Sequence, residues 1–165
     1  MGIAATLAGM ALPAIGNVVD STKLNQAGRS VERELQSARL KAVSLNRSLR
    51  VRFNCPAAGQ FRTVEVTGVT ATDTDTNRCT AAAYPYPNPS DSNPATPQSD
   101  GPIHYLDQAT LTGTNQVLEF RHNGTAYTVS GNSATAINGE VVLTVTRKLK
   151  TKVVYVNALG RIRMP

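Results

Sequence analysis

Hydrophobic and polar residues recur with two different periods along the chain, and the period changes near Leu49. Between Asp20 and Leu49, apolar or small residues return every three or four positions, which places them on one face of an α-helix. From Leu49 the segments "LRVRF" and "QFRTVEVTG" alternate with period two, as β-strands do, and Pro56 and Gly59 between them indicate a turn. The pattern therefore predicts a helix followed by strands. The helical stripe consists of Leu24, Gly28, Val31, Leu35, Ala38, Ala42, Leu45 and Leu49.

The rest of the predicted helix surface is polar and largely charged. One apolar stripe with a hydrated remainder is typical of a helix that packs one face against a core. We interpret these charges as a solvated helix face rather than as a binding site. The polar residues on this surface are Arg29, Glu32, Arg33, Gln36, Arg39 and Lys41, and all but Gln36 are charged.

A long polar segment, residues 68–113, interrupts the predicted strands. It is rich in Thr, Asn, Asp, Ser and Pro, and six of the nine prolines lie in "YPYPNPSDSNPATPQSDGP". Because proline cannot propagate a helix or a central strand, the segment predicts a long surface loop, pinned near its start by Cys79. Tyr84 and Tyr86 alternate with proline and are either recognition aromatics or, on the simpler interpretation, part of an extended loop.

The last third of the chain returns to strand patterns. Within "VLEFRHNGTAYTVS" and "TAINGEVVLTVTRKLKTKVVYVNALGRIRM", the pairs Asn123-Gly124 and Asn138-Gly139 favour tight hairpin turns. The triplet that ends at Thr125 also matches a glycosylation acceptor, but the turn explains it without further assumptions. The whole pattern predicts an α+β fold in which a helical part, residues 1–49, packs on an antiparallel β-rich domain, residues 50–165.

The N-terminal run is uncharged as far as Val19. It does not match a signal peptide, because no basic residue precedes the apolar stretch. It is also a weak membrane span, since it is rich in Ala and Gly and contains Pro13 and Asn17, whereas a bilayer requires about 20 strongly apolar residues. The run has the pattern of the second half of a membrane helix.

Positive charge is concentrated at the other end of the chain. The protein has 17 Lys and Arg against 11 Asp and Glu, a formal net charge of +6, and six of the basic residues follow the last acidic residue, Glu140. Residues 1–146 are therefore formally neutral. Charge segregated in this way indicates an anionic partner such as nucleic acid or anionic lipid. The six basic residues are Arg147, Lys148, Lys150, Lys152, Arg161 and Arg163.

Few side chains suited to catalysis or metal binding are present. We expect Cys55 and Cys79 to form one disulfide of an exported protein, and the alternative is two separate buried thiols. His104 and His122 are too few for a histidine-rich metal site, and no phosphate-binding glycine motif or nucleophilic serine motif occurs. We expect neither an enzyme nor a bound metal or cofactor.

The segment "ALPAIGNVVDSTKLNQAGRSVERELQSARLKAVSLNRSLRVRF" resembles the GspH/FimT family of minor pilins and type II secretion pseudopilins. The resemblance rests on Ala11-Leu12-Pro13 and on "LQSARLKAVSLNRSLRVRF" from Leu35 to Phe53. It implies a pilin-like fold in which a long N-terminal helix anchors the subunit in the inner membrane, with a periplasmic globular domain, and later forms the core of a pilus or pseudopilus. The implied partners are other major and minor pilins or pseudopilins, the inner membrane before assembly, and a prepilin peptidase for the full-length precursor.

The chain departs from the family at its start. Family members open with a basic leader, a Gly at the cleavage site, a methylated Phe and a nearby Glu, and none of these is present. Aligning Pro13 with the family's proline places Met1 inside the mature helix. We expect a truncation, through either a misassigned start codon or a deliberately shortened chain, and an upstream reading frame without an apolar segment and Gly-Phe junction would contradict this.

The family resemblance also gives a role to the basic tail. Gly160-Arg161-Ile162-Arg163 matches the GRxR tail motif associated with DNA-binding FimT-like minor pilins of natural transformation. The implied partner is double-stranded DNA, bound by the six basic residues given above. Strand alternation should place Arg161 and Arg163 on one face, and likewise Lys148, Lys150 and Lys152 if their segment is extended, so that neighbouring strands merge them into one basic surface.

Two alternatives to DNA binding remain. Lysines on an edge strand also prevent sheet-to-sheet aggregation, which would explain them without a ligand. A GspH-type minor pseudopilin of the type II secretion system would act in pseudopilus assembly and protein export without binding DNA. Neighbouring competence and pilus genes, or secretion genes, would separate the two.

Overall fold

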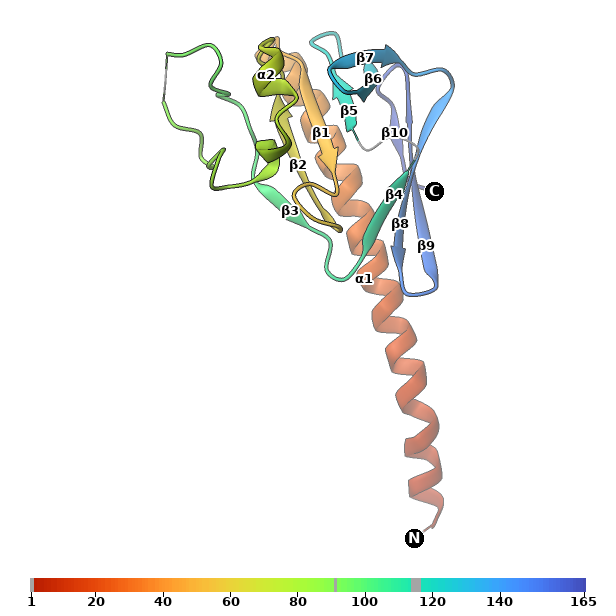
Figure 1. The fold of residues 1–165 in the computed structure, drawn as a ribbon. Coiled ribbons are helices and arrows are strands. Elements are labelled where there is room, and N and C mark those ends of the chain that lie inside the picture. Colours follow the sequence, from red (N-terminus) through yellow and green to blue (C-terminus); the bar gives the residue numbers. More distant parts are fainter. Residues whose placement is uncertain (1, 91, 114–116) are drawn as a thin grey trace.

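The computed structural model describes residues 2–90, 92–113 and 117–165. Met1, which we expect to lie within a longer helix, is outside these residues. Within them, one long helix, α1, is followed by a six-stranded and a four-stranded antiparallel sheet (Figure 1). The strand orders are β3-β2-β1-β5-β6-β7 and β10-β9-β8-β4. The elements are α1 (Gly2–Leu45), β1 (Leu49–Phe53), β2 (Gln60–Glu65), α2 (Thr70–Asp73), the 3-10 turn η1 (Thr76–Cys79), β3 (Ile103–Tyr105), β4 (Thr110–Gly113), β5 (Val117–Phe120), β6 (Ala126–Ser130), β7 (Ser133–Ala136), β8 (Glu140–Arg147), β9 (Lys150–Asn157) and β10 (Ile162–Arg163).

The second half of α1 packs against both sheets, and its first half extends away from them (Figure 1). The predicted apolar stripe is confirmed where the helix meets the sheets, since Leu24, Val31, Leu35, Ala38 and Ala42 are all buried. They join the inward-facing side chains of the central strands in one core. In the described residues, no helix combines the length and the apolarity that a membrane span requires.

The helix ends earlier than the apolar pattern predicted. It stops at Leu45, and Leu49 is the first residue of β1. Asn46 adopts a left-handed conformation with φ 53°. The amide of Asn46 donates to the carbonyl of Val43, and the next amide donates to the carbonyl of Ala42, which together form a Schellman cap. Asn tolerates this conformation better than most residues, because a short polar side chain can hydrogen-bond to the nearby backbone.

The two Asn-Gly pairs have different roles. Asn123-Gly124 closes the hairpin between β5 and β6, as predicted, with Gly124 at φ 79°. Asn138-Gly139 was expected to form a hairpin, but it connects β7 in one sheet to β8 in the other. The hairpin partner of β8 is β9, and their turn contains Lys148, at φ 52°, and Leu149.

The segment 68–113 is mostly irregular, as predicted, but it also contains α2, η1 and two strands. Strand β3 extends the first sheet beside β2, and β4 extends the second beside β8. The expectation of a continuous loop was therefore wrong at its end, because these strands use hydrogen-bonding edges supplied by distant parts of the chain.

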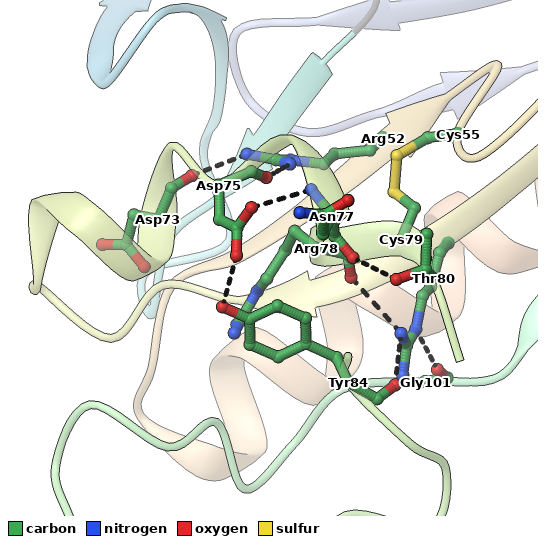
Figure 2. The surroundings of a disulfide bond; sticks show 11 residues. Arg52, Cys55, Asp73, Asp75, Asn77, Arg78, Cys79, Thr80, Tyr84 and Gly101 are labelled. Atoms are coloured by element: carbon green, nitrogen blue, oxygen red, sulfur yellow. Dashed lines mark hydrogen bonds between the residues drawn. A yellow bond between two sulfur atoms is a disulfide. The ribbon is translucent and has the colours of Figure 1, made fainter. Parts of the chain in front are cut away.

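The proline-rich part of this segment is tied to the first sheet. The predicted disulfide between Cys55 and Cys79 is present, with a Cα–Cα distance of 5.4 Å. Figure 2 shows Arg78 lying over the ring of Tyr84 beside this bond. The fully buried Arg62 donates to the carbonyl of Tyr84 at 2.8 Å and to that of Gly101 at 2.7 Å. Both ends of the proline-rich stretch are thus fastened to β2.

Candidate nucleic-acid interface

The GRxR segment begins with a tight turn at Gly160. Gly160 has φ 70°, its amide donates to the carbonyl of Asn157 at 2.9 Å, and the amide of Arg161 donates to the Asn157 side chain at 2.9 Å. A Cβ atom at position 160 would collide with the carbonyl oxygen of Gly124. Glycine is therefore required here both by the left-handed backbone and by the close approach of a second turn.

Arg39 of α1 connects the helix to both turns. Its Nε donates to the carbonyl of Gly124 at 3.0 Å, and its Nη2 donates to the carbonyl of Leu159 at 3.3 Å. The guanidinium group thus positions the C-terminal segment and the β5–β6 turn against the same part of the helix. Without the helix side chain, two backbone carbonyls would lose their donors.

A groove runs along α1 on both sides of this contact. It is lined by side chains of α1 between Arg33 and Ser44, by the turn at Asn123-Gly124 and by residues 160–162; we call it the α1 groove. Gln36, Arg39 and Leu40 border both of its parts, so the two parts adjoin each other along the helix. Four basic residues line it, and none of the described residues that line it is acidic. The basic residues are Arg33, Arg39, Lys41 and Arg161.

Arg161 and Arg163 lie in different surroundings. Arg161 is exposed at the α1 groove, and among the described residues its side chain makes no hydrogen bond or ion pair. Arg163 donates to Glu140 at 2.9 Å, and its guanidinium carbon lies 4.6 Å from the ring centroid of Tyr155. The hydrogen bond from Arg163 to the Glu140 carboxylate raises the pKa of Arg163 above its ordinary value. Arg161 is therefore the better placed of the two to meet a phosphate.

The basic residues of the β8–β9 hairpin do not share one strand face as expected. Arg147 is buried and bonds to Asp20 at 3.2 Å and to the carbonyl of Asp107 at 2.6 Å. Lys148 lies in the turn rather than in an extended segment, and it also bonds to Asp20. Lys150 is exposed at the start of β9. Beyond it, Lys152 is half-buried, close to Gly28 of α1.

The basic residues that were expected to merge into one surface are spread along strand β9 and its neighbours. Strand β9 spans eight residues, from Lys150 to Asn157, and lies between the hairpin turn and the C-terminal turn. At about 3.3 Å per residue, Lys150 lies about 23 Å along the strand from Asn157, beside the turn that leads to Arg161. Lys152 is only three residues from Tyr155, the strand partner of Arg163. The groove residues and the residues of the hairpin turn therefore form two patches, and Lys152 and Arg163 lie between them along β9 and β10.

Three residues of the α1 groove, Arg33, Arg39 and Lys41, were interpreted from the sequence as a solvated helix face. Helical periodicity identifies the buried stripe, but it does not show which polar positions border a neighbouring turn. A signal was nevertheless available, because no acidic residue occurs between Glu34 and Glu65 although the stretch is rich in Arg and Lys.

The Asp20 contacts predict a specific dependence of stability on pH. Hydrogen bonds from Lys148 and then Arg147 hold the pKa of Asp20 below its ordinary value of 3.8. The stabilisation is thus complete above that value and is lost as the pH falls through the lower folded-state pKa. We expect Asp20→Asn to be less stable than the wild type at neutral pH, with the difference closing as the pH falls through the lowered pKa of Asp20. Urea unfolding of both proteins across this range would measure it, and a difference independent of pH would contradict it.

A long N-terminal helix whose second half packs on antiparallel sheets, while its first half extends outward, defines the pilin fold, and this confirms the predicted fold class. Two similar solved structures are crystal forms of the type IV minor pilin FimU of Pseudomonas aeruginosa. One has 17% sequence identity and a TM-score of 0.52, covering 86% of this chain and 92% of that chain. The other has 15% identity and a TM-score of 0.56, covering 90% and 92%. No protein-family model matches the chain, and no curated protein sequence matches it.

Proposed function

We propose that the chain is a minor pilin, a structural and non-catalytic subunit of a type IV pilus-like filament, that captures double-stranded DNA in the α1 groove for uptake in natural transformation. The pilin fold supports the filament role. In that role the N-terminal helix associates with other pilins and is held in the inner membrane before assembly, with the globular domain in the periplasm. A full-length precursor would be cleaved by a prepilin peptidase and methylated at its new N-terminus.

The convergence of basic residues from distant segments is the observation that carries the DNA proposal. Arg33, Arg39 and Lys41 come from the helix and Arg161 from the tail, and they meet along a groove without acidic residues among its described lining. Arginine suits phosphate because its planar fork binds two oxygens at once. Contacts of this kind position a protein on the DNA backbone without reading sequence, so we expect affinity for unrelated duplexes.

Neutral substitutions that each remove one positive charge test this proposal, because the two basic patches can be altered separately. Arg161→Gln is expected to weaken binding of the protein to duplex DNA about tenfold, which is the effect of losing one charge-assisted hydrogen bond. The Arg33→Gln, Arg161→Gln double variant should lose more. Fluorescence anisotropy with two duplexes of unrelated sequence would measure this.

Lys150→Gln is the matched control, because it removes the same charge at the far end of β9. About 0.1 M salt limits electrostatic effects to about 10 Å, so Lys150→Gln should change affinity less than about twofold. An equal loss in both variants would show a response to net charge and would contradict a site in the α1 groove. Absence of binding by a folded wild-type domain would favour the pseudopilin alternative, for which neighbouring secretion genes would be independent support.

A further inference from the structure

The most exposed large apolar side chain among the described residues is at the tip of the β8–β9 turn. Leu149 is 100% exposed, and it lies between Lys148 and Lys150. An apolar side chain that meets only water at the end of a hairpin contributes nothing to the core. Its position between two cationic side chains is the arrangement found where proteins rest on membrane surfaces, with apolar groups inserted and lysines at the headgroups.

The turn is fixed at a definite height along α1. Asp20 on the helix bonds to Arg147 and Lys148 on either side of the end of β8. A second ion pair close by joins Lys23 of α1 to Asp107 at 2.7 Å, and Arg147 donates to the carbonyl of Asp107. These contacts hold the hairpin tip against the helix.

The position along α1 at which the turn is held coincides with the end of the uncharged part of the helix sequence. Asp20 is the first charged residue of the chain, and residues 1–19 carry no charge. In Figure 1 the β8–β9 turn lies at the end of the globular domain from which α1 extends toward the N-terminus. A bilayer surface at the end of the uncharged segment would therefore lie level with Leu149.

The charges around the turn favour an anionic surface. Five basic side chains gather there against two acidic ones, Asp20 and Asp107, among the residues that the structure describes, so positive charge is in excess. The basic side chains are those of Lys23, Arg147, Lys148, Lys150 and Lys152.

We propose that the β8–β9 turn is a membrane-contact site for anionic phospholipid headgroups, with Leu149 inserted between them. The proposal rests on the proposed function in one respect, because it requires the N-terminal helix to be held in the membrane before assembly. The exposed Leu149 favours lipid over nucleic acid, since a DNA backbone offers no apolar phase for it.

The absence of tryptophan from the sequence makes a direct test available, because Leu149→Trp introduces a single tryptophan at the tip, which can be excited selectively over tyrosine. The full chain carrying this substitution would be mixed with vesicles of phosphatidylcholine alone or with added phosphatidylglycerol. We expect a blue shift of the tryptophan emission, and quenching by brominated lipid, with the anionic vesicles. Lys150→Gln in the same background should weaken vesicle binding about fivefold, the effect of one basic residue near an anionic surface.

Leu159→Trp is the matched control, because Leu159 is 72% exposed but lies beyond the opposite end of β9. Its emission should not shift. Three results from vesicle-bound chain would each overturn the proposal: an unshifted emission from Leu149→Trp, an equal shift with phosphatidylcholine alone, or an equal shift from Leu159→Trp. So would failure of the chain to bind vesicles, or a shift of the Leu149→Trp emission caused by duplex DNA instead of lipid. DNA binding by the α1 groove is measured separately with Arg161→Gln, so failure of one proposal is distinguishable from failure of the other.

Discussion

Arg78→Met is expected to lower the free energy of unfolding by about 3–5 kcal/mol, the usual cost of breaking a buried ion pair by removing one partner. The Arg78 side chain is 1% exposed, and its Nη2 donates to Asp100 at 3.0 Å and to the carbonyl of Glu65 at 2.6 Å. Burial raises the pKa of Asp100, and Arg78 is the main charge that opposes this shift. Without Arg78, an ionised Asp100 would be buried with only the amide of Glu65 and the charge of Arg62 to offset its burial.

Arg163→Met is a matched control, because Arg163 also bonds to a carboxylate and lies over a tyrosine ring. Its side chain is 52% exposed, so its loss should lower the free energy of unfolding far less than the loss of Arg78 does. Urea unfolding of both variants would give the comparison. The deficit of Arg78→Met should shrink at acid pH, because protonation removes the buried charge of Asp100. An equal loss of unfolding free energy in the two variants would contradict a stabilising role for the buried Arg78–Asp100 ion pair.

Loss of the Cys55–Cys79 disulfide is expected to cost about 3 kcal/mol, mainly because the bond restricts the unfolded chain. The bond closes a loop with a sequence separation of 24 and attaches η1 to the end of β1 (Figure 2). Unfolding with and without reductant would measure the difference, and the Cys55→Ala, Cys79→Ala variant should not respond to reductant. Two free thiols in peptides from periplasmically expressed protein would contradict the bond itself.

Local sequence signals predicted the helix and the first strands well. The apolar stripe from Leu24 to Ala42 gave the buried face of α1, and alternation gave β1 and β2. Turn chemistry was less decisive. Asn138-Gly139 fits a hairpin as well as Asn123-Gly124 does. A hairpin there is excluded only because β9 and β4 occupy the two edges of β8. The turn at Lys148 has no such sequence signal. Lys148 adopts a positive φ because the pairing of β8 with β9 requires a tight turn at that position.

The candidate site was less predictable, because it depends on contacts between distant segments. Arg147 belongs to the basic tail in sequence, but its side chain is buried and hydrogen-bonded to Asp20, 127 residues away. Arg39 looks like an ordinary surface residue of the helix until the turns at Gly124 and Leu159 present their carbonyls to it. Periodicity describes one element at a time, so it does not show which surfaces two elements form together.

The salt dependence of DNA binding is the most direct test of the α1 groove as a DNA-binding site. Each phosphate neutralised on duplex DNA contributes a slope of about −0.9 to the plot of log K against log salt concentration, so four basic side chains predict about −3 to −4. Arg161→Gln should make the slope shallower by about one, equally on unrelated duplexes, while the fold persists. No measurable affinity at low salt, or a slope that Arg161→Gln leaves unchanged, would contradict the account.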